Sequence, residues 1–246
     1  GMVDSVMVSS VGEAAVSAVS LVDTVNVLIV NLFAALATGG AVVSSQYLGR
    51  RDRENACRSA KQLVWSTFGM AVLVGAAVLL FNRHILRGVF GNVEPDVMRA
   101  AETYFWLSAL SYPMLALYNA GAALFRSMGN SRVSLFASAI MNVINISGNA
   151  ALIYGLRWGV AGAGTATLAS RTAAGVIMLV LLHKPENPIV LRRLLRPEWD
   201  GGILRSILRV GVPNGLEGGV FQIGKLLVAS LITTYGTAAI AANAIA

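Results

Sequence analysis

The chain alternates between long apolar segments and short segments that hold most of its charged residues. An apolar helix of about 20 residues is long enough to cross a bilayer, whereas membrane β-strands are only about 10 residues long and alternate in polarity. The pattern predicts an all-α, polytopic membrane helical bundle. Its spans are expected at 1–10 (incomplete), 14–47, 61–81, 97–124, 133–154, 159–182 and 208–234.

Composition supports this class and argues against several functions. Hydrophobic residues make up 56% of the chain and charged residues only 13%, against about 25% charged in soluble proteins. The two histidines are far apart, Cys57 is the single cysteine, and no P-loop pattern occurs, so we expect no enzyme activity and no cofactor. The net charge of +7 fits cytoplasmic loops rather than nucleic-acid binding, because no aromatic-basic module accompanies it.

The basic residues orient the spans. Thirteen of the 19 Lys and Arg residues lie in or directly beside the segments 48–60, 126–132 and 184–206. Only four lie in or beside the alternate loops. Because cytoplasmic loops are enriched in Lys and Arg, these three segments are predicted to be cytoplasmic, in a bacterial inner membrane.

A weak repeat indicates two lobes. The segment Gly12–Val22 resembles Gly236–Ala246 at four identical positions. We interpret residues 1–183 as an N-terminal lobe, 184–206 as a cytoplasmic connector, and 207–246 as the start of a second, pseudo-symmetric lobe. Within the connector, 189–195 is predicted to be an amphipathic interfacial piece. The chain opens inside an apolar segment, so we expect it to be a fragment.

Polar residues inside the predicted spans are the candidate site, because a buried charge costs about 2.5–3.5 kcal/mol on insertion scales. Asp4 lies within the first span, and it is either an ion- or proton-binding carboxylate or a structural acid. In the fifth span, Asn145 and Asn149 share a helix face, with Asn142 nearby. They are candidates either for cation binding or for hydrogen bonds between helices. Thr167 in the sixth span could present its hydroxyl to the same pocket.

Further residues are candidates for a substrate path. Arg171 follows Thr167 by about one turn and is expected to pair with an acid such as Asp4 or to line water. The segment 213–219, which holds a proline, three glycines and an acid, predicts a break in the seventh span, as at many transporter substrate sites. The path candidates are Gln46, Asn142, Arg171, Pro213, Glu217, Gln222 and Lys225.

An ordered set of loose motifs resembles one known family. It comprises Met2-Val-Asp-Ser-Val-Met-Val-Ser-Ser-Val-Gly-Glu-Ala-Ala15, Gln46-Tyr-Leu-Gly-Arg-Arg-Asp52, Asn145-Ile-Ser-Gly-Asn149, Gly159-Val-Ala-Gly-Ala163 and Val212-Pro213 with Phe221-Gln-Ile-Gly224. The set is similar to the multidrug and toxic compound extrusion (MATE) transporters. The resemblance implies one six-helix lobe plus the first helices of a second lobe, within a twelve-helix antiporter.

The resemblance also implies a function and a site. MATE proteins export organic cations and drugs in exchange for Na⁺ or H⁺. In this chain the resemblance places the cation site, with its candidate Na⁺ ligands, at Asp4, Asn145, Asn149 and Thr167. Family members with a well-described site carry aspartate where Asn149 stands, so the coupling ion stays open between Na⁺ and H⁺. The full-length protein is expected to be a monomer. The alternatives are a related lipid-linked precursor flippase and a non-transporting membrane scaffold.

Overall fold

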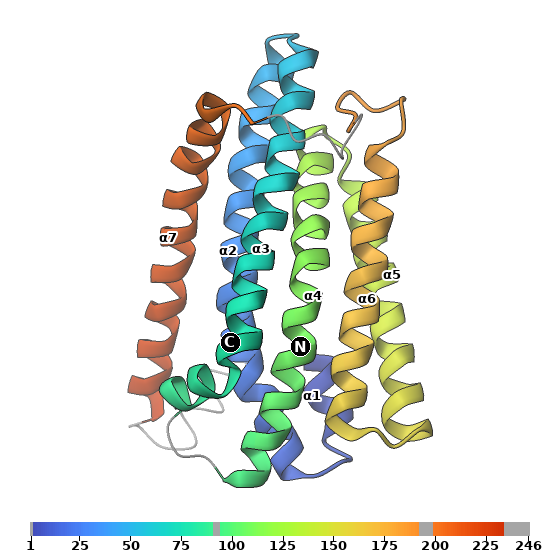
Figure 1. Ribbon diagram of the computed structural model, residues 1–246, viewed down its shortest axis with the longest axis vertical. Coiled ribbons are helices and arrows are strands. Elements are labelled where there is room, and N and C mark those ends of the chain that lie inside the picture. The colour runs from blue at the N-terminus through green and yellow to red at the C-terminus, as the bar shows by residue number, and fades with distance from the viewer. Residues whose placement is uncertain (1, 91–93, 192–198, 234–246) are drawn as a thin grey trace.

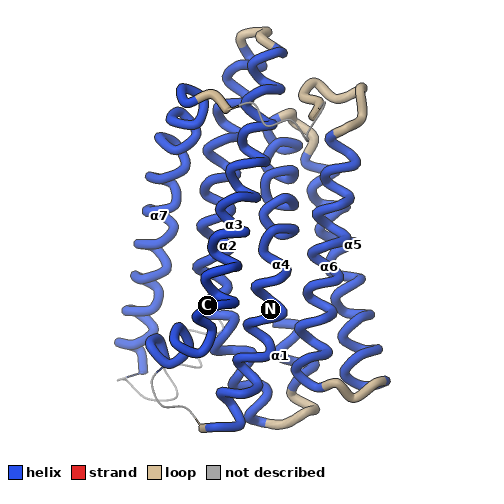
Figure 2. Tube along the Cα trace, in the orientation of Figure 1, coloured by secondary structure: helices blue, strands red, loops and turns tan. Residues whose placement is uncertain are grey.

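The protein is a bundle of long helices. The computed structural model describes residues 2–90, 94–191 and 199–233, and no strand occurs within these ranges (Figure 2). The elements are α1 (Met2–Val8), α2 (Glu13–Gly49), α3 (Arg53–Phe90), α4 (Pro95–Ser127), α5 (Ser131–Asn149), the π-helix η1 (Ala150–Gly155), α6 (Gly159–Leu182) and α7 (Gly201–Thr233).

Helix α4 is the centre of the bundle. It packs against α2, α3 and α6, while α5 covers α6 and α7 lies along α2 (Figure 1). Two large clusters of buried apolar side chains follow α4 through its length, one around Tyr104 and Tyr112 and the other around Leu124 and Phe125. The predicted all-α bundle is therefore confirmed.

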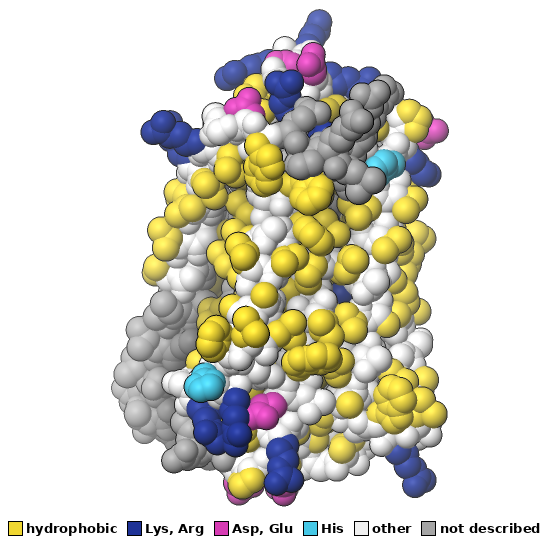
Figure 3. Space-filling view, viewed as in Figure 1, with side chains coloured by type: hydrophobic (Ala, Val, Ile, Leu, Met, Phe, Trp, Pro, Cys, Tyr) yellow, Lys and Arg dark blue, Asp and Glu magenta, His cyan; other side chains and the backbone are white. Residues whose placement is uncertain are grey.

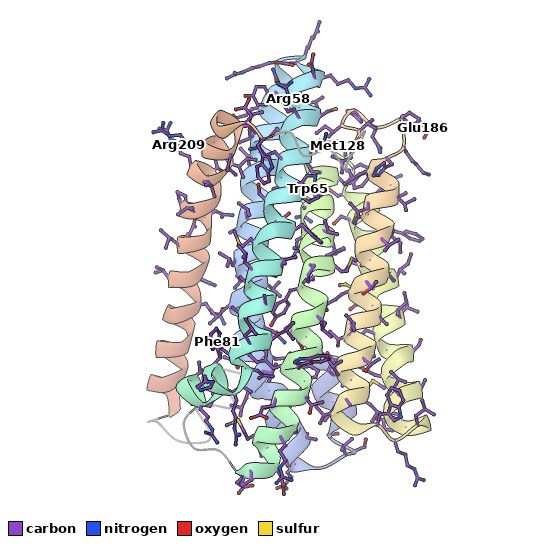
Figure 4. The ribbon with its side chains drawn as sticks, in the orientation of Figure 1. Arg58, Trp65, Phe81, Met128, Glu186 and Arg209 are labelled. Carbon is purple, nitrogen blue, oxygen red and sulfur yellow. The ribbon has the colours of Figure 1, made fainter. Side chains whose placement is uncertain are left out.

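The surface separates charge from apolar residues as a bilayer requires. Four helical segments of the described chain, α2, α3, Ser131–Gly155 and α6, are long and apolar enough to cross a membrane. Figure 3 shows an apolar band between two ends that carry the charged side chains. Arg58, Glu186 and Arg209 lie toward the same end of the bundle (Figure 4), which we call the basic end, and Phe81 lies toward the opposite end.

Helix α3 extends beyond the predicted span. We expected the span to end at residue 81, but α3 continues to Phe90 after a non-helical turn at Phe81 (φ −114°, ψ 16°). Contacts with α4 hold the added segment: Asn82 Nδ2 donates to the carbonyl of Glu102 at 2.8 Å, and Arg83 lies 3.3 Å from the Glu102 carboxylate. Tertiary contacts thus extend a helix that its polar sequence argued against.

The α2–α3 turn and the connector interlock at the basic end. Arg53 donates to the carbonyls of Asn187 (2.7 Å) and Pro188 (2.9 Å), and Ile189 and Leu191 are buried. The described part of the predicted interfacial piece is therefore not a surface helix, and residues 192–198 lie outside the description. At the start of α3, the side-chain and backbone hydrogen bonds from Asn55 lower the pKa of the Asp52 carboxyl.

The prediction of a broken seventh span is wrong. Helix α7 begins at Gly201, where Asp200 Oδ1 accepts the backbone N–H of Gly202 at 2.8 Å, and it continues through Pro213 to Thr233. Proline removes one backbone donor, but a membrane helix tolerates that loss when the surrounding structure keeps its axis in place. Here the packing of α7 along α2 provides that support.

Candidate functional site

Asp4 is the buried acid at the centre of the candidate site. Its side chain is 4% exposed, although α1 has only two turns. Its Oδ1 accepts a hydrogen bond from Asn149 Nδ2 at 2.6 Å, and its Oδ2 accepts one from the Tyr104 hydroxyl at 3.4 Å. Donors from α4 and α5 thus hold a carboxylate that α1 supplies.

The amides of α5 extend this cluster to α6. Asn149 Nδ2 lies 3.5 Å from Asn145 Oδ1, one turn earlier on the same helix, and Asn145 Nδ2 donates to Thr167 Oγ1 at 3.2 Å. Asn149 is fully buried and Thr167 is 4% exposed. The structure therefore brings together Asp4, Asn145, Asn149 and Thr167, the four residues predicted as one site; their role stays a prediction.

Local sequence explains how α5 delivers Asn149. The α-helix ends at Asn149, and the chain continues as the π-helix η1, a rare conformation that is frequent at functional sites. Gly148 lets α6 approach, because a Cβ there would lie 3.0 Å from the Ala166 Cβ. At Gly162, an added Cβ would lie 3.1 Å from Leu152. These two glycines therefore allow close packing between α5 or η1 and α6.

One atom of the cluster has no partner. Asn149 Oδ1 is buried, and no hydrogen-bond donor reaches it within the described part of the chain. The orientation of this amide is fixed because its Nδ2 must face the carboxylate of Asp4, which accepts but does not donate when ionised. A buried amide oxygen without a partner costs free energy unless a cation or a donor is supplied. Its surroundings are suited to a small cation or a proton.

Tyr104 is the member of the cluster that sequence reasoning missed. It is 1% exposed, and its hydroxyl donates to Asp4 Oδ2. A tyrosine in an apolar span is common in helix packing, so its position gave no separate signal.

A second polar network begins one turn further along α4. Arg171 donates to Ser111 Oγ at 2.8 Å. The Tyr112 hydroxyl donates to Asn26 Oδ1 at 2.7 Å, and Asn26 Nδ2 donates to Ser108 Oγ at 3.4 Å. These side chains join α2, α4 and α6 in the interior of the bundle.

The other path candidates lie apart from the Asp4 cluster. Gln46, Asn142, Pro213 and Glu217 are exposed on the described chain. Gln222 lines an open cleft between α2 and α7, with a volume of about 340 Å³. The side chain of Lys225 lies outside the described residues.

Taken together, the long apolar helices and the polar groups buried among them define a multi-pass helical membrane protein of the kind that includes secondary transporters. The MatE family model matches residues 1–151. The chain belongs to this family, the MATE proteins, which are transporters and not enzymes.

Relatives match along almost the whole chain. A probable multidrug resistance protein NorM of Thermotoga maritima is 25% identical over 254 aligned residues, which cover 100% of this chain and 53% of the relative. A probable NorM of Chromobacterium violaceum is 30% identical and covers 94% of this chain and 51% of the relative. The chain therefore spans about half the length of these relatives.

Solved structures share the fold. A MATE transporter in an outward-facing conformation superposes with a TM-score of 0.86 at 25% identity, covering 96% of this chain and 52% of that one. An inward-facing MATE structure superposes with a TM-score of 0.84 at 25% identity, covering 95% and 53%. The chain therefore superposes on both conformations with similar scores.

Proposed function

We propose that the complete protein is a secondary active multidrug efflux transporter that exports organic cations and drugs in exchange for Na⁺ or H⁺ by alternating access. The observation that carries this proposal is the buried Asp4 carboxylate, 2.6 Å from Asn149 Nδ2 and next to the unpartnered Asn149 Oδ1. The relatives named as multidrug resistance proteins support the same function.

The chemistry of the cluster suggests how an ion would act. Ionised Asp4 accepts hydrogen bonds from Asn149 and Tyr104, which tie α1 to α5 and α4. A proton on Asp4 turns one oxygen into a donor, for which the unpartnered Asn149 Oδ1 is an acceptor after rotation of the amide. A Na⁺ ion would instead draw on the oxygens of Asp4, Asn145, Asn149 and Thr167. Binding of a proton or of Na⁺ changes the hydrogen bonds between α1 and its neighbours, and so favours one conformation over another.

Replacing Asp4 tests this proposal. In the complete gene product, Asp4→Asn should abolish gradient-driven ethidium efflux from cells or vesicles, because the amide can neither take a proton nor supply a charge. The matched control is Glu13→Gln, which neutralises an exposed carboxylate at the start of α2. Both variants must be present in the membrane at the wild-type level. Full export by Asp4→Asn would remove the proposal.

Reconstituted vesicles separate the two ions. Efflux should respond either to an imposed Na⁺ gradient or to an imposed pH gradient. If Na⁺ is the ion, Asn149→Ala should raise the Na⁺ concentration for half-maximal transport, because it removes an oxygen ligand. If transport proceeds equally with neither gradient, antiport is excluded.

We further propose that the protein resides in a bacterial inner membrane as a monomer, with the basic end in the cytoplasm. The excess of Lys and Arg in 48–60, 126–132 and 184–206 supports this orientation. Labelling of single cysteines at these loops from the cytoplasmic side, but not from outside, is the expected result.

A further inference from the structure

Helix α1 is the shortest α-helix in the described ranges, and it carries Asp4. It lies toward the end of the bundle opposite the basic end (Figure 1), in contact with α2, α5, η1 and α6. Two side chains of the continuous α5–η1 segment bond to it. Asn149 Nδ2 donates to Asp4 Oδ1 at 2.6 Å, and the Tyr154 hydroxyl donates to the Met7 carbonyl at 3.2 Å. The segment therefore holds α1 at two points about one helical turn apart.

The Met7 carbonyl belongs to the last turn of α1, whose carbonyls have no backbone partner within the helix. The Ser10 hydroxyl also donates to it at 2.9 Å, and the Ser9 hydroxyl donates to the Val6 carbonyl at 2.6 Å. Both serines lie in the turn that directly follows α1, so their bonds travel with α1 when it moves. Tyr154 comes from a different helix, and its bond therefore fixes this end of α1 relative to α5.

The π-helix explains why Asn149 and Tyr154 face the same neighbour. In an α-helix, with about 3.6 residues per turn, side chains five positions apart point about 140° away from each other. A π-helix is closed by hydrogen bonds five residues apart, as from the Leu156 N–H to the Ala151 carbonyl at 3.0 Å, so residues at that spacing lie nearly above one another. The π turn thus aims both side chains at α1, which an unbroken α-helix would not do.

A tyrosine near the end of a membrane span has a simpler interpretation, because such residues commonly place the ring in the interface and the hydroxyl in water. Tyr154 is 51% exposed, in agreement with an interfacial ring. Its hydroxyl nevertheless bonds to a backbone carbonyl of α1, and a rare π turn orients it there. These two observations favour a role in placing α1 over a role as a membrane anchor alone.

We propose that Tyr154 is a positioning residue for the Asp4 site. Through the Met7 carbonyl it keeps α1 in the position in which Asp4 bonds to Asn149, and the π turn sets the register of both bonds. Loading of Asp4 with Na⁺ or a proton competes with this position, so Tyr154 tunes the ion concentration to which α1 responds. The inference rests on the proposed antiport for its consequence, but the position of α1 can be measured without transport.

Spin-label distances test the position of α1 in the complete protein without native cysteines. One label replaces Val6, which is 71% exposed on α1, and the other replaces Arg132, which is exposed at the basic end of α5. Without Na⁺ and at neutral pH, the parent should give one narrow distance distribution and Tyr154→Phe a broader one, because α1 then keeps only one of its two bonds to the α5–η1 segment.

Two controls separate positioning from local stability. Ser10→Ala removes the other side-chain bond to the Met7 carbonyl, and Tyr47→Phe removes a tyrosine hydroxyl for which the described chain shows no hydrogen-bond partner. Both should keep the narrow distribution. A narrow distribution in Tyr154→Phe, or an equal broadening in Ser10→Ala, would overturn the proposal.

A titration provides a readout that a merely structural role would leave unchanged. Na⁺ is added to one sample, the pH is lowered in another, and the change in the distance between the two labels is followed. Because one hydrogen bond fewer opposes the change, Tyr154→Phe should respond at an ion concentration about two- to tenfold lower than the parent. An unchanged midpoint would contradict the proposal. If the parent responds to neither ion, the proposed antiport fails, whereas the distance comparison still decides whether Tyr154 positions α1.

The role of the π turn is tested by deleting Ala151. The deletion leaves Asn149 and the tyrosine four positions apart, a spacing that an α-helix places on one face. The narrow distribution should therefore be retained by the deletion and lost when Tyr154→Phe is added to it. A broad distribution in the deletion variant alone, at wild-type thermal stability, would refute the register that we assign to the π turn.

Discussion

The crossing of α2 and α7 gives the sharpest mechanical prediction. At Gly39, an added Cβ would lie 2.7 Å from the backbone N of Gly211 and 2.7 Å from the carbonyl oxygen of Ile207. These are backbone atoms, so they cannot move aside as a flexible side chain could. Gly39→Ala therefore forces the two helices apart at this point, on the basic side of the cleft.

The expected size of the effect follows from these distances. Ordinary contact begins near 3.4 Å, so the backbones must separate by several tenths of an ångström. Overpacking of this kind costs about 1–3 kcal/mol. In a protein that exchanges between conformations, the same free energy changes their ratio by a factor of about 5–150. Gly39→Ala should therefore depopulate the conformation in which α2 and α7 are packed at the basic end.

Spin-label distances measure this shift. In a variant of the complete protein without native cysteines, labels at positions 50 and 205, which Arg50 and Arg205 occupy, exposed near the basic end, should show a longer distance distribution in Gly39→Ala. Efflux should fall together with the population of the packed state.

Two other glycines serve as graded controls. At Gly211, the Cβ would meet the Ala35 carbonyl at 3.3 Å, so Gly211→Ala should have a smaller effect than Gly39→Ala. At Gly49, nothing lies within 4 Å, so Gly49→Ala should have none. The reasoning is refuted if Gly39→Ala leaves the distances unchanged, or if Gly49→Ala alters them equally.

Three further substitutions test other contacts. Asn149→Leu removes both the donor to Asp4 and the unpartnered oxygen, and vesicle efflux should fall by about tenfold or more, as for the loss of a charged hydrogen bond. Tyr112→Phe leaves the Asn26 amide oxygen unpaired in the core. Thermal unfolding in detergent should show that the free energy of unfolding falls by about 1–3 kcal/mol. Gln62→Ala removes two hydrogen bonds, of 2.7 and 3.4 Å, to the backbone of Asp200 just before α7. In the same assay the free energy of unfolding should fall by about 1–2 kcal/mol. An unchanged free energy of unfolding would refute a stabilising role for Gln62.

The sequence predicted the fold class and four members of the Asp4 cluster. Hydrophobic segment length is a local property, and it predicted most helices to within a few residues, including Gly159–Leu182. The spacing of Asn145 and Asn149 is also a local property, and residues four apart lie on one face of a helix. The grouping of these amides with Asp4 and Thr167 came from the resemblance to MATE proteins, since spacing within one helix does not reveal its neighbours.

Only the tertiary structure decided which distant segments meet. It extended α3 to Phe90 through contacts with α4, and it kept α7 continuous through Pro213 along α2. It added Tyr104 to the Asp4 cluster and gave Arg171 a serine partner. It also placed the α2–α7 cleft, which depends on the faces that two helices far apart in sequence present to each other. Hydropathy records how apolar each segment is, but the partner of a side chain depends on helix packing, which no local pattern contains.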